Sequence, residues 1–145
     1  MHHLVFVYGT LMRGEVNHHL LARAQFMGTH RTAPSFTLFL LGAYPGAVHT
    51  GHTSLLGEVF RLDGASLRRL DRLEEYPSLY DRQPIPTPYG RAWIYLYRGR
   101  RLDRPVIASG SWGALLADPR SCRAVGVRHT RDPKNRPAST PPPRR

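Results

Sequence analysis

Two short segments of this chain hold residue types that could do chemistry together. The first spans residues 4–14 and runs from an apolar stretch into the sequence Tyr8-Gly9-Thr10-Leu11. The second spans residues 70–82 and holds carboxylates, a proline and a Tyr-x-Arg sequence. A glycine turn after a strand can hold an anion through its backbone N–H groups, and a positioned carboxylate can accept a proton. The two segments therefore predict chemistry on a small amino-acid derivative.

The first segment has the pattern of an anion-binding turn. Gly9 lets a ligand approach the main chain closely. Successive N–H groups around it form a nest for an anion, and the start of a helix nearby adds positive potential. A plain turn between a strand and a helix has the same pattern. The segment lacks the Lys-Ser/Thr pair of a P-loop and the glycine spacing of a dinucleotide-binding loop, which excludes both motifs.

The second segment places carboxylates at the end of an expected helix. Glu74 follows a helix predicted over residues 63–73, whose terminal carbonyl groups favour the protonated form of a nearby carboxylate. Such a group suits general base catalysis near neutral pH. The leucine stripe of this helix should face the core, which sets Asp71 and Glu74 beside it and turns Glu75 outward. Three surface acids on an amphipathic helix explain the same pattern, so the residues alone leave the role open.

Tyr80 and Arg82 alternate along an expected strand and therefore share one of its faces. Either side chain can orient a substrate carboxylate, Arg82 through two parallel hydrogen bonds. A cross-strand ion pair and a half-buried tyrosine explain the pair equally well. The histidines and the single cysteine, Cys122, show no metal-ligand spacing, so we predict no metal and no cofactor.

Hydrophobic periodicity and turn signals indicate the elements that must position these residues. Asn17 and Asp63 stand where helix N-caps are expected, and Ala43-Tyr44-Pro45-Gly46 is a strong turn signal. The expected strands are 4–8, 25–32, 36–41, 55–62, 80–86, 91–97 and 106–108, and the expected helices are 18–24, 63–73 and 112–117. This order is not a regular βαβ alternation. It predicts an α+β fold with a curled, mostly antiparallel sheet or barrel.

The composition sets the class of protein. A length of 145 residues suits one domain, predicted over 1–127, and the Pro-rich basic segment 128–145 is predicted to be a disordered tail. The net charge of +11 comes from scattered arginines and this tail, which favours weak attraction to polyanions and no specific nucleic-acid site. No apolar stretch is long enough for a membrane span or a signal peptide. With only one cysteine, we expect a cytoplasmic protein with no membrane partner.

Taken together, the motifs resemble the γ-glutamylcyclotransferase-like family. Each motif is short, but their order and spacing agree with the family from about residue 4 to residue 117. The matching motifs are Phe6-Val7-Tyr8-Gly9-Thr10-Leu11, Tyr44-Pro45-Gly46, Leu56-Gly57-Glu58-Val59-Phe60 and Leu70-Asp71-x-Leu73-Glu74, continuing to Pro77-x-Leu79-Tyr80-x-Arg82.

The resemblance implies a small mixed, mostly antiparallel β-barrel with flanking helices. It implies an enzyme that cyclises the γ-glutamyl group of a small γ-glutamyl amine or peptide to 5-oxoproline and releases the amine. It also implies that Glu74 is the catalytic general acid and base, that Tyr80 lines the pocket and that no cofactor takes part. The residues whose main-chain groups would hold the glutamyl moiety are Tyr8, Gly9, Thr10 and Leu11.

One residue departs from the family pattern. Glu75 stands where members often have glycine, so the turn after Glu74 is expected to differ. A non-catalytic module that binds a small acidic metabolite is the competing interpretation, and the intact Glu74 argues against it. The sequence identifies neither the leaving amine nor an oligomeric state.

Overall fold

The computed structural model describes residues 1–100 and 103–118. Cys122, the predicted domain boundary at residue 127 and the predicted tail 128–145 lie outside the described residues. No helix in the described part of the chain is long and apolar enough to cross a membrane.

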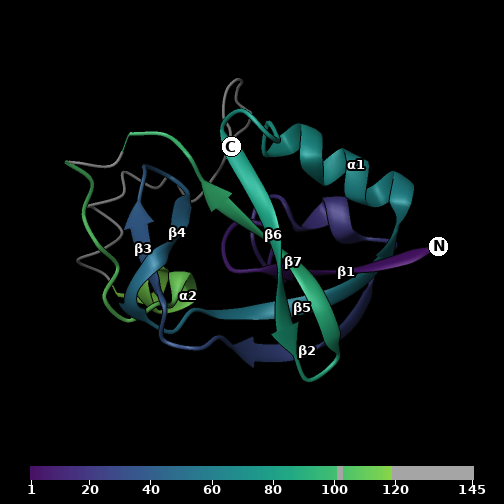
Figure 1. The fold of residues 1–145 in the computed structure, drawn as a ribbon, viewed down its shortest axis with the longest axis horizontal. Helices are drawn as coiled ribbons and strands as arrows, with labels where there is room; N and C mark the ends of the chain where they lie inside the picture. The colour runs from purple at the N-terminus through teal and green to yellow at the C-terminus, as the bar shows by residue number, and fades with distance from the viewer. Residues whose placement is uncertain (101–102, 119–145) are drawn as a thin grey trace.

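The described strands form a five-stranded sheet and a separate two-stranded ribbon (Figure 1). The sheet has the order β2-β5-β1-β7-β6, and β3 pairs with β4 in the ribbon. The central strand β1 runs antiparallel to β5 and parallel to β7. The strands are β1 His2–Val7, β2 Gln25–Arg31, β3 Phe36–Leu40, β4 Pro45–Thr53, β5 Leu56–Asp63, β6 Tyr80–Thr87 and β7 Gly90–Tyr97. The predicted α+β class with a mostly antiparallel sheet is confirmed.

The predicted barrel is wrong, because the sheet stays open. Its edge strands β2 and β6 do not pair with each other in the described residues. On β6, Pro84 and Pro86 have no backbone N–H to donate to a further strand. The ribbon β3-β4 pairs within itself and adds a single bridge between Phe39 and Val106, where a short strand was predicted over 106–108.

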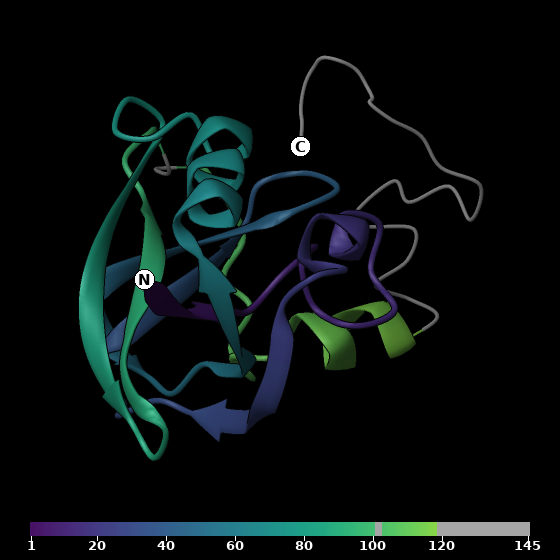
Figure 2. The same cartoon turned by 90° about the vertical axis from the view of Figure 1, so that its right-hand side faces the viewer.

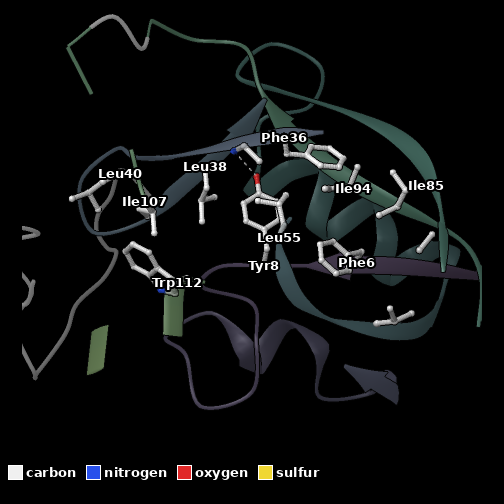
Figure 3. Close-up of a cluster of buried hydrophobic side chains, with 13 residues drawn as sticks. Phe6, Tyr8, Phe36, Leu38, Leu40, Leu55, Ile85, Ile94, Ile107 and Trp112 are labelled. Atoms are coloured by element: carbon white, nitrogen blue, oxygen red, sulfur yellow. Dashed lines mark hydrogen bonds between the residues drawn. The ribbon is translucent and has the colours of Figure 1, made fainter. Parts of the chain in front are cut away.

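The second half of strand β1, residues 5–7, is buried on both faces because its side chains alternate between two hydrophobic cores. Phe6 and Tyr8 contribute to the core that β1 shares with the ribbon and with α2 (Trp112–Ala117) (Figure 3). Val5 and Val7 contribute to the core on the side of helix α1 (Gly64–Leu73). The end of β1 is therefore held rigidly from two sides, which fixes the start of the glycine turn.

Helix α1 begins where the sequence predicts. Asp63 accepts a hydrogen bond from the N–H of Ser66 at 2.8 Å, which confirms the predicted N-cap. Leu67 and Leu70 are buried in the core beside β1, and Leu73 packs against that core. Figure 1 shows the helix lying above β1, with its C-terminal end toward the ribbon.

The helix predicted over 18–24 is a 3-10 helix, η1, which spans only His18–Leu21. Asn17 does not cap it with a side-chain hydrogen bond. The Asn17 side chain instead donates to the Thr10 hydroxyl at 3.0 Å, so the group that would start the helix is used by the preceding loop.

Strand β4 was not predicted, because its first two residues, Pro45 and Gly46, indicate a turn. The turn lies just before them, closed by a hydrogen bond from the Leu41 N–H to the Tyr44 carbonyl at 3.0 Å. Proline is tolerated as the first residue of a strand, and Pro45 takes that position in β4.

The predicted hairpin β6-β7 and the predicted short helix α2 are confirmed. Ser111 caps α2 by accepting a hydrogen bond from the N–H of Ala114 at 3.0 Å. The indole N–H of Trp112 donates to Glu15 at 3.0 Å, which ties α2 to the loop after β1. Figure 2 shows η1 and α2 next to each other on the same side of the molecule.

Candidate active site

A pocket lies where the C-terminal ends of β1 and α1 meet the turn between β3 and β4. We call it the Glu74 pocket. The empty space between its walls, counted together with the open solvent at its mouth, is about 450 Å³. Its lining residues are Phe6, Val7, Tyr8, Gly9, Thr10, Leu11, Tyr44, Pro45, Leu73, Glu74, Tyr80 and Tyr95. All six predicted site residues are among them.

In the glycine turn, the carbonyl groups already accept hydrogen bonds from the protein, whereas the N–H groups remain available to bind a ligand. The Gly9 carbonyl accepts from the Met12 N–H at 3.1 Å, and the Thr10 carbonyl accepts from the Asn17 N–H at 2.9 Å. The Leu11 carbonyl accepts from Nδ1 of His18 at 3.0 Å. By contrast, the N–H groups of residues 9, 10 and 11 donate no hydrogen bond within the described residues.

Only glycine fits at position 9. A Cβ atom there would lie 2.7 Å from Cγ of Pro45, which is closer than real Cβ contacts come. The glycine therefore lets the β3-β4 turn pack directly on the turn that follows β1, and this contact forms one wall of the pocket.

Glu74 reaches the pocket because α1 stops at a tight C-terminal turn. The Glu74 N–H still bonds to the Leu70 carbonyl at 2.9 Å, whereas Glu75 adopts a left-handed φ of 52°. The following Tyr76 N–H returns to the Asp71 carbonyl at 2.9 Å, which completes a Schellman-type cap. Glu74 is half-buried and lines the pocket, and Glu75 is exposed, as the leucine stripe predicts.

Three tyrosines of the pocket have hydroxyl groups that already donate. Tyr8 donates to the Tyr95 carbonyl at 2.7 Å. It also accepts from the Ala47 N–H at 3.0 Å, the dashed line at the Tyr8 hydroxyl in Figure 3. Tyr80 donates to the Pro45 carbonyl at 3.0 Å. Tyr95 donates to Asp71 at 2.7 Å. A hydroxyl has one hydrogen, so none of the three can also donate to a ligand while these bonds hold.

The ionisation of Tyr8 and Tyr95 is suppressed. Burial raises the pKa of Tyr8 far above its ordinary value, and the negative charge of Glu74 raises it further. Burial also raises the pKa of Tyr95, together with its hydrogen bond to Asp71 and the charges of Asp71 and Glu74. Among the described lining residues, Glu74 is the only one with a carboxylate side chain. None of these residues is a lysine, arginine, histidine or cysteine.

Arg82 does not line the pocket. Its guanidinium instead binds Asp71 through two hydrogen bonds, from Nε at 2.9 Å and from Nη2 at 3.2 Å. Arg82 therefore forms a structural ion pair, but with helix α1 and not across two strands as the structural alternative had it. No group of three or more His, Cys, Asp or Glu side chains in the described ranges is placed to hold a metal ion.

The sequence did not assign a site role to the other six lining residues, which are Phe6, Val7, Tyr44, Pro45, Leu73 and Tyr95. Tyr44 and Pro45 were recognised as a turn signal and as part of a family motif, and Tyr95 as a strand residue. The alternation of aromatic residues along β7 was the signal for Tyr95, because its side chain faces α1 rather than the ribbon.

Comparison with known proteins identifies the family. Residues 5–114 match the family model described as "Gamma-glutamyl cyclotransferase, AIG2-like". The chain belongs to this family.

Relatives with solved structures share the fold. The solution structure of protein ytfP from Escherichia coli superposes with a TM-score of 0.63 at 41% identity, covering 75% of this chain and 95% of that one. The crystal structure of an AIG2-like protein from mouse superposes with a TM-score of 0.63 at 30% identity, covering 72% of this chain and 84% of that one. A relative in Vibrio cholerae is 49% identical over 112 residues, which cover 77% of this chain and 96% of the relative.

Proposed function

We propose that this protein is a γ-glutamylcyclotransferase that converts the γ-glutamyl group of a small γ-glutamyl amine or peptide to 5-oxoproline. The observation that supports this most strongly is the pairing of Glu74 with the turn at residues 8–11 in one pocket. One carboxylate and several amide donors are sufficient for this reaction, because the substrate supplies both reacting groups.

The chemistry requires folding of the substrate and movement of protons. The α-amino nitrogen attacks the γ-amide carbon, the C–N bond to the leaving amine breaks, and a five-membered lactam remains. Holding the two groups in contact lowers the barrier by several kcal/mol, of the ~7–11 kcal/mol available from proximity. Glu74 takes a proton from the α-amino group and returns it to the leaving nitrogen, so that it acts first as general base and then as general acid.

The turn at residues 8–11 supplies the donors for negative charge. The hydroxyl protons of Tyr8, Tyr80 and Tyr95 are already donated to protein acceptors. The N–H groups of residues 9–11 are not. These amides therefore bind the substrate α-carboxylate or the oxyanion that forms on the γ-carbonyl oxygen.

The character of the pocket favours a neutral or cationic leaving amine. The described lining contains no cationic side chain, and the exposed Glu75 adds negative charge next to Glu74. A leaving group with a free carboxylate would meet repulsion and no counter-charge. We therefore expect γ-glutamyl amines to be better substrates than γ-glutamyl dipeptides.

The test is a matched pair of substitutions assayed for 5-oxoproline. Glu74→Gln removes the proton acceptor and should lower kcat by roughly 10²–10⁴-fold, the usual contribution of a general base. Glu75→Gln makes the same chemical change one residue away, at an exposed site, and should keep activity. Full activity of Glu74→Gln would disprove the assignment. A wild-type protein that binds γ-glutamyl compounds without releasing 5-oxoproline would support the non-catalytic binding module instead.

A further inference from the structure

A half-buried ion pair joins the last turn of α1 to the edge strand β6. Arg82 binds both carboxylate oxygens of Asp71, at 2.9 and 3.2 Å, and each side chain is only 16% exposed. Two parallel hydrogen bonds fix the relative orientation of the two groups as well as their distance. The pair therefore sets how the end of α1 sits against β6.

The same carboxylate is linked to the Glu74 pocket. Oδ1 of Asp71 also accepts from the hydroxyl of Tyr95 at 2.7 Å, and Tyr95 lines the pocket. The Tyr95 carbonyl in turn accepts from the hydroxyl of Tyr8, the first residue of the glycine turn. Arg82, Asp71, Tyr95 and Tyr8 are therefore linked in sequence, with Tyr95 bonded to Asp71 through its hydroxyl and to Tyr8 through its main-chain carbonyl.

Arg82 also holds the chain on the other side of Glu74. Its guanidinium lies 4.6 Å from the ring centre of Tyr76 and 4.3 Å from that of Trp93. Tyr76 follows Glu74 by two residues, and Asp71 precedes it by three. One side chain thus contacts residues on both sides of Glu74.

From this geometry we propose that Arg82 is a positioning residue for the cyclisation: together with Asp71 it holds Glu74 in its working position and neutralises the carboxylate of Asp71. This inference rests on the proposed function of Glu74. The competing explanation is that the pair stabilises the fold without any effect on the reaction.

Neutralisation of Asp71 by Arg82 matters because the negative charges of Asp71 and Glu74 both act on Tyr95. Both negative charges raise the pKa of Tyr95, and the charge of Arg82 lowers it. Without Arg82, the charge of Asp71 would be left uncompensated near Glu74 and would favour protonated Glu74 at higher pH. The other titratable or charged groups around this end of α1 lie on several segments. They are Tyr8 from the turn after β1, Tyr44 from the β3-β4 turn, Tyr80 from β6, Tyr95 from β7, Arg98 just after β7, and Arg72, Glu75 and Tyr76 from the helix end.

The experiment measures 5-oxoproline release as a function of pH for Arg82→Gln, Asp71→Asn, the double variant and Arg82→Lys. Arg82→Gln should lower kcat by at least about tenfold with little change in KM, because a displaced catalytic group costs up to ~10²-fold. In the plot of kcat/KM against pH, the increase with pH should occur at a higher pH for Arg82→Gln than for the wild type. The profile of Asp71→Asn should rise at lower pH, and that of the double variant should return to the wild-type position while kcat stays low.

Two variants serve as controls. Arg91→Gln removes the same charge from an exposed position on the neighbouring strand β7 and should leave both kcat and the pH profile unchanged. Arg82→Lys keeps the charge but loses the two-point contact, so its pH profile should match the wild type while its kcat falls. If Arg82→Gln does not fold, two other variants still distinguish the effect of position from that of charge. Arg82→Lys changes the contact that positions Glu74, and Asp71→Asn changes the charge near it.

An Arg82→Gln protein with wild-type kcat and an unmoved pH profile, even with reduced thermal stability, would show that the pair is only structural. A wild-type protein that releases no 5-oxoproline would overturn the proposed function. The effect of the Arg82–Asp71 pair on Glu74 would then be tested by NMR. The ¹³C signal of the Glu74 carboxyl, assigned by its loss in Glu74→Gln, would be followed as a function of pH in the wild type and in Arg82→Gln. An equal titration midpoint in wild type and Arg82→Gln would overturn the inference as well.

Discussion

Replacing Glu75 by glycine should stabilise the protein. Glu75 has a φ of 52°, in the left-handed region where residues with a Cβ atom are strained and glycine is not. The backbone there is fixed by two hydrogen bonds, from the Glu75 N–H to the Arg72 carbonyl at 3.2 Å and from the Tyr76 N–H to the Asp71 carbonyl at 2.9 Å. The helix end therefore imposes the conformation, and the side chain at 75 adds only its strain.

The size of the gain follows from two opposing contributions. The left-handed conformation costs an L-residue about 1–2 kcal/mol. Glycine has more conformational freedom than glutamate in the unfolded chain, which lowers the stability of the folded state by about 0.4–1 kcal/mol. The net stabilisation should be about 0.5–1 kcal/mol, which corresponds to a rise in Tm of about 2–5 °C for a domain of this size.

Urea and thermal unfolding of three variants would measure this. Glu75→Ala removes the carboxylate but keeps a Cβ atom, so it should gain little. Glu75→Asn should lie between alanine and glycine, because asparagine tolerates the left-handed region. If Glu75→Gly were no more stable than Glu75→Ala, the gain would not come from backbone conformation and the strain argument would fail.

Two further substitutions test buried polar contacts. Tyr8→Phe should destabilise the protein by about 1–3 kcal/mol in urea unfolding, because it leaves the Ala47 N–H and the Tyr95 carbonyl without their buried partner; a change below about 0.5 kcal/mol would contradict this. Burial raises the pKa of Glu15, so the folded state favours its protonated form. The contribution of Glu15 to stability therefore falls as pH rises from the ordinary glutamate range through that raised value. Glu15→Gln keeps an acceptor for the Trp112 indole and should exceed the wild type in stability at pH 8 but not at pH 4, and an equal difference at both pH values would refute this.

Local pattern was sufficient for most of the elements. The N-cap at Asp63, the leucine stripe of α1 and the hairpin β6-β7 depend on neighbours within a few residues, so the sequence predicts them directly. The shortened helix at residues 18–24 and the missed strand β4 have tertiary causes. Asn17 gives its side chain to Thr10 rather than to a helix, and Pro45 begins a strand because β3 is there to pair with it.

The open sheet was also beyond local pattern. Alternation along a strand indicates which side chains share a face, but not whether the first and last strands of a sheet meet. The tertiary structure places the strands in the order β2-β5-β1-β7-β6, with β2 and β6 at opposite edges of the sheet.

By itself, the sequence determined which residues could act: the turn Tyr8 to Leu11, the helix-end Glu74 and the strand residue Tyr80. Only the tertiary structure decided that they share one pocket with Tyr44, Pro45 and Tyr95, and that Arg82 binds Asp71 rather than lining that pocket. The physical reason is the span of the contacts. The bond that joins the glycine turn to β7 links residues 87 positions apart, and such a contact forms only when separately formed elements pack together.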